Sequence, residues 1–324
     1  MTATALGSIP DGVLQSSQPV LLPGLVAHWP MVQAARQSDA AFSDYLRGFD
    51  AGQPLLMWRG PPSIKGRFFY NDDFTGFNFA REGQTLSAVL DELLAGSTDA
   101  VYLGSTAIDS AFPALGRDHL LPALAGFKPL VSLWLGNQTR IAPHFDLPDN
   151  MACVVAGRRR FTLFPPDQVA NLYIGPLDLT PAGQPVSLVD PSQPDLVRFP
   201  RYAEALRHAQ VFELEPGDAL FLPSQWWHGV ESLAPISALV NFWWRQSPPF
   251  MDTPLNTLMM ALLTLRDLPR AQRDAWRVLF DHYIFDADIH TAAHIPPAAR
   301  GILGPMDEPR ARQLRALLLN RLNR

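Results

Sequence analysis

Between residues 100 and 245 the chain alternates short apolar runs with Pro, Gly, Asn and Asp turn residues, and helical periodicity is scarce there. Short apolar runs bounded by turn residues predict β-strands. Because helices hardly intervene, these strands favour an antiparallel sandwich or barrel over a parallel α/β sheet. The fold class we expect is therefore mainly β. The clearest predicted strands are Val101–Leu103, Leu130–Leu135, Met151–Val155, Arg160–Phe164, Ala219–Leu222 and Ala238–Trp244.

The regions on either side of this β core have sequence patterns that predict helices. Before it, apolar runs are mixed with a helical stretch at Thr85–Leu94, so we expect flanking N-terminal α/β elements. After it, helices are predicted, the first one starting at Thr253, which has the form of a helix cap followed by proline. We therefore expect a first domain over residues 1–250, with its β core at about 100–245, and a C-terminal helical region over residues 251–324.

Leucines recur at helical spacing within residues 254–266 and 309–322. These stripes are more apolar than the capping of a barrel requires. Because large exposed apolar patches usually mark interfaces, we expect the helical region to pair two subunits into a homodimer. Packing of the same stripes against the β core is the alternative.

Bulk properties exclude several classes of protein. The formal net charge of −5 shows no basic excess, so we expect no nucleic-acid surface. No apolar window approaches 18 residues, and Met1–Pro10 lacks the pattern of a signal peptide, so we expect neither a membrane span nor secretion. Cys153 is the single cysteine and lies in an apolar run, which indicates a buried small hydrophobe in a reducing compartment. The expected location is cytoplasmic.

The segment Ile141–Asn150 contains His144 and Asp146 two residues apart. On a strand, residues two apart point to the same side, so this spacing would aim an imidazole and a carboxylate at one point. A third ligand is expected from His228, which follows a Pro-Gly turn and an apolar strand and is placed just past the end of that strand. Two imidazoles and one carboxylate with open opposite positions are the ligand set of non-haem Fe(II) oxygenases.

A His-x-Asp triplet alone is weak evidence, because a lone histidine is more often a satisfied core or surface group. The second histidine, after its turn and strand, reverses that preference. A competing cluster combines Asp286, Asp288, His290 and His294. It lacks the glutamate of the zinc-protease pattern and runs into two prolines, so we interpret it as a polar connection.

Arg159 is the one charge on an otherwise apolar face of the run Met151–Phe164, apart from Gly157. A buried arginine is costly unless it meets an anion, and its planar fork suits a carboxylate. A bound carboxylate is therefore favoured, while pairing with an internal Asp or Glu, or outward snorkelling, remains open. Tyr102 could add a hydroxyl to the same anion or be a core tyrosine. Asn241 is an amide in an apolar strand and needs partners.

Several segments of the chain resemble the JmjC, cupin-like hydroxylases, and they are closest in pattern to the asparaginyl hydroxylases and to bacterial cupin-like proteins. The resemblance covers about residues 15–250. It implies a double-stranded β-helix (jelly-roll) that uses Fe(II), 2-oxoglutarate and dioxygen to hydroxylate a C–H bond. The segments are Pro19–Pro30, Pro143–Asp146, Gly157–Asp167, Pro216–Asp218, Trp226–Ser232 and Val240–Trp243.

The resemblance also implies roles for single positions. His144, Asp146 and His228 match the iron ligands. Arg159 and Tyr102 match the positions that hold the distal carboxylate of 2-oxoglutarate, and Asn150 and Asn241 match asparagines near the metal.

There are two departures from this pattern. Arg159 stands where the asparaginyl hydroxylases have a lysine. Ile141 stands where they have a threonine, and this removes a hydroxyl from the cosubstrate pocket.

Three rival functions stay open at this level. They are a cupin metalloenzyme without 2-oxoglutarate, a cupin metalloprotein that binds a small acid without turnover, and an interaction scaffold built on the C-terminal helices. The resemblance favours a protein or peptide side chain as substrate, although a small molecule also fits. The aromatic segment Arg67–Phe79 could border the pocket or be structural.

Overall fold

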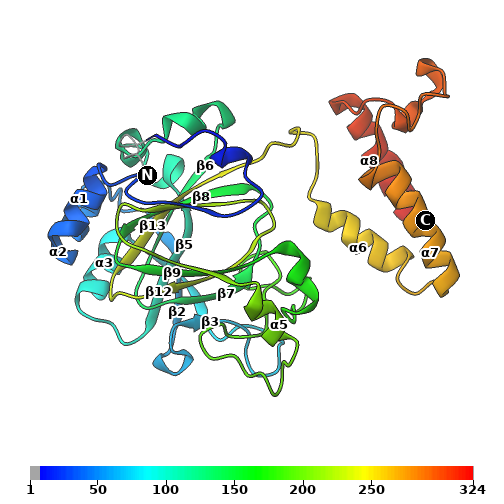
Figure 1. Cartoon of the computed structure of the whole chain (residues 1–324). Coiled ribbons are helices and arrows are strands. Elements are labelled where there is room, and N and C mark those ends of the chain that lie inside the picture. Colours follow the sequence, from blue (N-terminus) through cyan, green and yellow to red (C-terminus); the bar gives the residue numbers. More distant parts are fainter. Residues whose placement is uncertain (1–7, 324) are drawn as a thin grey trace. The chain divides into compact units, whose positions relative to one another are not determined.

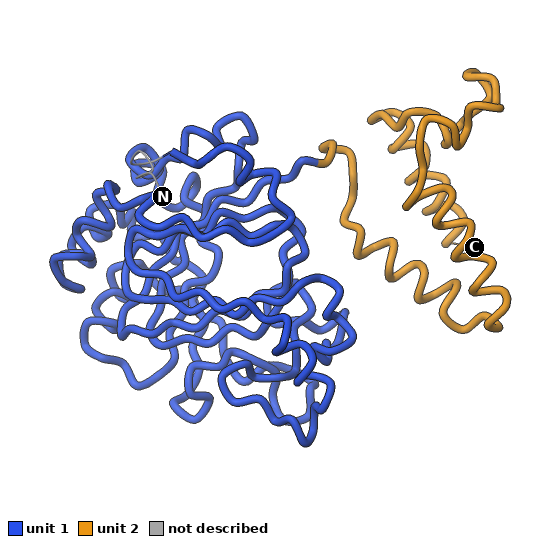
Figure 2. The backbone as a smooth tube through the Cα atoms, in the orientation of Figure 1, with its two compact units in different colours: residues 1–246 blue, residues 247–324 orange. Residues whose placement is uncertain are grey.

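The computed structural model describes residues 8–323. The chain divides into two compact units, and the boundary between them falls between Gln246 and Ser247 (Figure 2). Within the described residues, the first unit contains two β-sheets (Figure 1). In spatial order the larger sheet consists of β1 (Val20–Leu22), β11 (Ala219–Leu222), β8 (Asp149–Ala156), β13 (Ser237–Trp244), β6 (Leu130–Gly136), β5 (Ala100–Ala107), β2 (Leu55–Gly60) and β4 (Ala80–Gln84). The smaller sheet consists of β10 (Gln210–Leu214), β9 (Arg159–Phe164), β12 (Trp227–Ser232), β7 (Arg140–His144) and β3 (Arg67–Phe68).

From β6 to β13 the chain passes repeatedly from one sheet to the other. Strands β6, β8, β11 and β13 belong to the larger sheet, and β7, β9, β10 and β12 belong to the smaller one. Every strand pair is antiparallel except β3 with β7. This alternation between two facing layers is a double-stranded β-helix, and it confirms the mainly β jelly-roll fold expected from the sequence.

The N-terminal helices cover one face of the larger sheet (Figure 1). Their apolar side chains, such as Met31, Phe42 and Leu90, pack in one cluster with sheet residues such as Met151 and Val240. A separate cluster fills the space between the two sheets. The central strands β8 and β13 of the larger sheet are therefore buried on both faces, which makes them a rigid support for the interior. The helices of this unit are α1 (Pro30–Gln37), α2 (Asp39–Arg47), α3 (Leu86–Leu94), α4 (Ile108–Ala111) and α5 (Tyr202–Arg207).

All six strands predicted from the sequence are present. The expectation that alternate residues keep to the same face throughout Met151–Phe164 is wrong. Gly157 has φ +65 and turns the chain between β8 and β9, which lie in different sheets. As a result Cys153 packs toward the helices, whereas Phe161 packs between the sheets together with Val154. The left-handed conformation of Gly157 therefore reverses which residues of the run, odd or even, point between the sheets.

The second unit, Ser247–Arg324, contains α6 (Pro254–Thr264), α7 (Arg270–Phe280) and α8 (Glu308–Leu322). Within its described part, the buried apolar residues are Ala292 and Ala311, each 8% exposed. In the stripe of α6, Leu258 is exposed whereas Leu255 and Leu262 are half-buried. In the stripe of α8, Leu317, Leu318 and Leu322 are exposed. No helix among residues 8–323 is both long and apolar enough to cross a membrane.

Candidate metal centre and anion pocket

His144 and His228 face each other across two neighbouring strands of the smaller sheet. They are register partners in the pairing of β7 with β12, and their ring centroids lie 4.4 Å apart. Directly opposed residues on an antiparallel pair share one face of the sheet. His228 therefore lies inside β12, which corrects the expectation that it follows just past the end of a strand. The strand that follows the Pro-Gly turn is β11, and it ends at Leu222. His228 belongs to the next strand, β12, which the sequence pattern does not predict.

Asp146 joins the two histidines from the connection after β7. The strand ends at His144, so the expectation that both residues of the His-x-Asp triplet lie on a strand is wrong for Asp146. The connection is held in place because the carbonyl of Asp146 accepts from the backbone N–H of Gln225 at 2.9 Å, and the Leu147 carbonyl accepts from the Ser224 hydroxyl at 2.7 Å. Two loops are thereby tied together beside the site.

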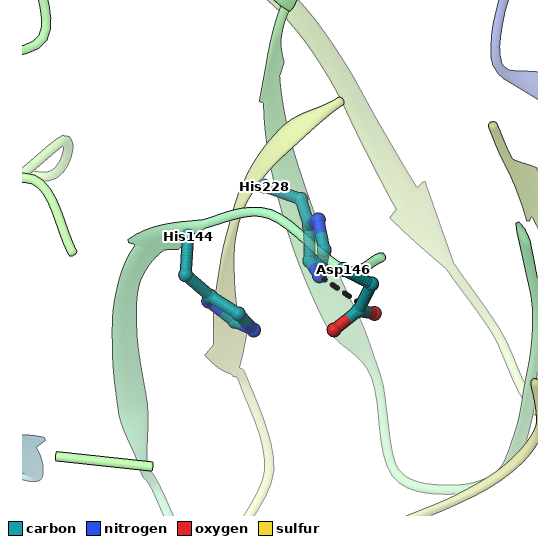
Figure 3. A group of neighbouring side chains, drawn as sticks. All are labelled: His144, Asp146 and His228. Carbon is teal, nitrogen blue, oxygen red and sulfur yellow. Dashed lines mark ion pairs between the residues drawn. The ribbon is translucent and has the colours of Figure 1, made fainter. Parts of the chain in front are cut away.

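The three side chains converge on one point, as Figure 3 shows. One ligand atom from each of His144, Asp146 and His228 lies within 4.8 Å of the others, and Nε2 of His228 is 3.5 Å from Oδ2 of Asp146. Asp146 and His228 are buried. The convergence that the sequence predicted is therefore present, although the backbone reaches it differently.

Hydrogen bonds orient both imidazoles for metal binding. Nδ1 of His144 lies 2.9 Å from the carbonyl of Ala142, and Nδ1 of His228 lies 2.9 Å from the carbonyl of Trp226. A carbonyl can only accept, so each Nδ1 donates, and the Nε2 of each ring is the nitrogen left to face the site. Burial, together with the neighbouring ring of His228, lowers the pKa of His144 to about 4. A neutral imidazole is the form that a metal requires.

The carboxylate of Asp146 is oriented by two donors. Its Oδ2 accepts from Nδ2 of Asn150 at 3.2 Å and from the indole Nε1 of Trp243 at 3.0 Å. Oδ1 of Asn150 in turn accepts a hydrogen bond from Nδ2 of Asn241 at 3.4 Å. Oδ1 of Asn241 accepts one from Nε1 of Trp134 at 2.7 Å. The two asparagines thus form a relay behind the carboxylate, of the kind that positions metal ligands.

Trp134 and Trp243 were not singled out from the sequence. Trp243 follows Asn241 by two residues on β13, so the period of the strand already places both on one face. Trp134 lies on the neighbouring strand β6, where no local pattern marks it as polar-facing.

Arg159 is 2% exposed and points between the sheets. Its Nε donates to the Ser237 hydroxyl at 2.9 Å, and its Nη2 donates to the Ser237 carbonyl at 3.3 Å. Among residues 8–323, no Asp or Glu forms an ion pair with it; its electrostatic partner is the hydroxyl of Tyr102. The open alternatives of internal pairing and outward snorkelling are therefore wrong. Burial lowers the pKa of Arg159, and burial raises the pKa of Tyr102 to about 12.

All seven residues singled out for the site line one cavity of about 100 Å³. They are His144, Asp146, His228, Arg159, Tyr102, Asn150 and Asn241. A buried guanidinium with no carboxylate partner, in the same cavity as the His-Asp-His group, leaves room for a ligand that brings its own negative charge. The donor set of the three residues suits Fe(II), and Arg159 with Tyr102 suits a carboxylate, so the chemistry of the cavity fits iron and 2-oxoglutarate.

Other residues considered in the sequence take different places. Ile141 lines the cavity, so the missing hydroxyl is a real difference in its wall. Of the aromatic segment Arg67–Phe79, Phe68 reaches the cavity, while Phe69 and Tyr70 belong to a separate apolar cluster. The cluster that contains His290 lies in a connection of turns in the second unit, as interpreted from the sequence.

A double-stranded β-helix with a His-Asp-His group in its interior is the architecture of a cupin-type protein. Residues 8–250 match the model of the family described as "Cupin-like domain". The chain belongs to this family, which confirms the resemblance to JmjC, cupin-like proteins.

Curated relatives agree with this assignment. The chain is 33% identical over 147 residues to a protein named lysine-specific demethylase JMJ31 from Arabidopsis thaliana, a match that covers 43% of this chain and 26% of that protein. It is 27% identical over 260 residues to Jumonji C domain-containing protein 5 from Drosophila melanogaster, covering 76% of this chain and 59% of that one. The chain thus spans from a quarter to three fifths of these two relatives.

A solved structure, that of E. coli ycfD, aligns with 95% of this chain and 65% of that chain, with 15% identity and a TM-score of 0.44.

Proposed function

We propose that the protein is an Fe(II)- and 2-oxoglutarate-dependent dioxygenase that hydroxylates a C–H bond of a protein or peptide side chain. The proposal rests on one observation: a single cavity holds the convergent His144, Asp146 and His228 together with a buried Arg159 that has no carboxylate partner among residues 8–323. Membership of the cupin-like family and the JmjC relatives support it. When bound, iron and 2-oxoglutarate supply the oxidising chemistry, and the protein supplies binding and orientation.

In this proposal the protein's own groups have three tasks. His144, Asp146 and His228 hold the metal on one side and leave its other positions open. Arg159 and Tyr102 bind the distal carboxylate of 2-oxoglutarate, whose negative charge compensates the buried guanidinium. The closed sheets and aromatic wall keep bulk water away from the reacting centre.

The proposed surroundings follow from the same reasoning. We propose a cytoplasmic enzyme that works as a homodimer and uses neither nucleic acid nor membrane as a partner. The single cysteine supports a reducing compartment, and the net charge of −5 argues against a nucleic-acid partner. The exposed leucines of α8 support the homodimer.

Protein purified without metal and supplied anaerobically with Fe(II) and 2-oxoglutarate tests the proposal. Wild type should bind one equivalent of Fe(II) and form succinate after oxygen is admitted. His228→Ala should lose both properties, whereas His208→Ala, at an exposed histidine after α5, should keep both. The second candidate is a cupin metalloprotein that binds a small acid without turnover. The acid-binding Arg159 supports it equally, and it would bind Fe(II) and 2-oxoglutarate without forming succinate.

A further inference from the structure

A second cavity, of about 300 Å³, lies on the outer face of the smaller sheet. Arg160 of β9 lines this second cavity, whereas its neighbours Arg159 and Phe161 line the metal cavity. Successive residues of a strand point to opposite faces, so the two cavities lie on opposite sides of the same sheet. Ile141 and Val230 contribute to both linings. The second cavity is large enough for a small organic ligand.

A row of charged side chains crosses the floor of the second cavity. Arg67 on β3 lies beside Arg140 on β7. Glu231 on β12 lies between Arg140 and Arg160, its register partners on β7 and β9. Residues in register on neighbouring strands share one face of a sheet. With Asp190 from the connection between β9 and β10, the lining carries three guanidiniums and two carboxylates, so one positive charge is in excess.

Both carboxylates of the lining are paired with the same two arginines. Nη1 of Arg140 lies 2.9 Å from Oδ2 of Asp190, and Nη1 of Arg160 lies 3.0 Å from Oε2 of Glu231. The other oxygen of Asp190 accepts from the backbone N–H and the hydroxyl of Ser192. The excess positive charge therefore belongs to the remaining arginine of the row.

Arg67 is that remaining arginine. Among the described residues it forms no ion pair, and its guanidinium donates one hydrogen bond, from Nη2 to the Leu188 carbonyl at 3.0 Å. Its Nε and Nη1 have no partner there and keep accessible surface. Burial lowers the pKa of Arg67, Asp190 raises it and Arg140 lowers it again. Its Cζ lies 3.8 Å from the ring centroid of Phe69, a cation–π contact that holds the side chain in place.

The rest of the lining is mostly apolar. Its apolar residues come from the sheet and from the connection between β9 and β10, and they include Ile141, Ala142, Pro191, Leu206, Ala209, Val211 and Val230. Apolar surface of this kind favours burial of an apolar ligand body. A ligand with one anionic group and a small apolar body would therefore match both parts of the cavity.

We propose that the second cavity is a further ligand site, which binds a small carboxylic acid through Arg67 and packs its apolar part against the surrounding aliphatic side chains. The planar guanidinium suits a carboxylate, and a monoanion balances the single excess charge. A phosphate group would bring a charge of about −1.5 to −2 close to Asp190 and Glu231, which repel it. The inference does not depend on the proposed function, because this site shares neither the metal ligands nor Arg159.

The test is a ligand-observed NMR titration of the full chain with hexanoate, with its neutral analogue hexanamide and with inorganic phosphate. Arg67→Met keeps an unbranched side chain and removes the charge. Arg201→Met is the matched control: Arg201 also stacks on an aromatic ring, that of Tyr173 at 4.5 Å, and donates to a backbone carbonyl, but it does not line the cavity. Val211→Trp narrows the cavity without a change in charge, from a position that is 57% exposed on the edge strand β10.

Wild type and Arg201→Met should bind hexanoate saturably and equally well. Arg67→Met and Val211→Trp should each bind it at least about 10-fold more weakly, the first through loss of a charge-assisted hydrogen bond and the second through lost space. Hexanamide and inorganic phosphate should bind wild type at least about 10-fold more weakly than hexanoate.

Three results would overturn the inference. Equal hexanoate affinity in wild type, Arg67→Met and Val211→Trp would place the acid elsewhere, as at Arg159. Hexanamide binding as tight as that of hexanoate, or tighter binding of phosphate, would remove the assignment to a carboxylate. Absence of saturable hexanoate binding to wild type at millimolar concentration would remove the site. If Arg67→Met does not fold, as judged by circular dichroism, the comparison of Val211→Trp with wild type decides.

Discussion

Arg159 and Tyr102 interact with each other inside the cavity that contains the His-Asp-His group, and each is almost fully buried. The pair joins a cation to a neutral hydroxyl, so it leaves the charge of the guanidinium uncompensated. Ser237 takes two of the five guanidinium N–H groups, one through its hydroxyl and one through its carbonyl. The remaining donors are sufficient for a bidentate contact with a carboxylate.

Replacement of Arg159 by alanine should therefore weaken 2-oxoglutarate binding far more than metal binding. A hydrogen-bonded charge of this kind contributes about 1.5–3 kcal/mol, so the apparent KM for 2-oxoglutarate should rise by about 10- to 100-fold. Succinate formation against 2-oxoglutarate concentration measures the first effect, and calorimetric titration with Fe(II) measures the second. Arg158→Ala, at an exposed arginine that pairs with Glu213, is the control. An unchanged KM in Arg159→Ala would remove the anion role.

Trp243 should influence the metal through Asp146. Trp243→Phe removes the indole N–H that donates to Oδ2 at 3.0 Å while it keeps an aromatic side chain in place. Loss of such a supporting hydrogen bond typically lowers metal affinity by about 10- to 100-fold. Competition titration with a coloured chelator gives the affinity. Trp276→Phe, in the second unit, is a matched control that should bind Fe(II) as wild type does. Equal affinities for Trp243→Phe and wild type would mean that Asn150 alone is enough to orient the carboxylate.

Cys153 should make folding stability fall at alkaline pH. Burial raises the pKa of its thiol above the ordinary unfolded value of about 8.5. Above that pH the unfolded thiol loses its proton while the folded thiol keeps it, so the unfolded state is favoured. The stability contributed by the buried thiol is complete below about pH 8.5 and declines by up to about 1.4 kcal/mol per pH unit above it.

Urea unfolding at pH 7.5, 8.5 and 9.5 tests this effect, with Cys153→Ala as the reference that lacks the thiol. The difference in unfolding free energy between the two proteins should shrink as pH rises. Alkylation supplies a second readout, since the folded thiol should react slowly with iodoacetamide and the unfolded thiol quickly. A difference that stays constant with pH, or fast alkylation of the folded protein, would contradict the burial argument.

The sequence predicted the chemistry of the site better than the backbone that supports it. The strands around Leu133, Val154 and Phe221 were found because each is a continuous apolar run between turn residues. Strand β12 was not predicted because Trp227–Ser232 is short, contains Gly229 and lacks the continuous apolar run that marks the other strands. His228 was identified nonetheless, from the Pro-Gly turn and the apolar strand that precede it, and the resemblance then matched it to an iron ligand.

Long-range pairings account for most of the remaining differences. The relay from Trp134 to Asp146 joins residues that are far apart in the chain, and strand order alone brings them together. The exchange of faces at Gly157 depends on a backbone conformation that composition does not reveal.

The C-terminal helices should form a homodimer interface. Leu258 of α6 is 47% exposed and Leu318 of α8 is 44% exposed. Among the described residues, the buried apolar side chains of the second unit are two alanines. Three helices that leave this much apolar surface uncovered need a partner, and a stable interface should bury more than about 1,000 Å².

Light scattering should give twice the chain mass at micromolar concentration. Leu258→Asp and Leu318→Asp should give monomers, because a carboxylate in an apolar interface centre is costly. Leu94→Asp, at an exposed leucine of the first unit, should leave the dimer intact. A monomeric wild-type protein would show instead that these leucines pack within a single chain.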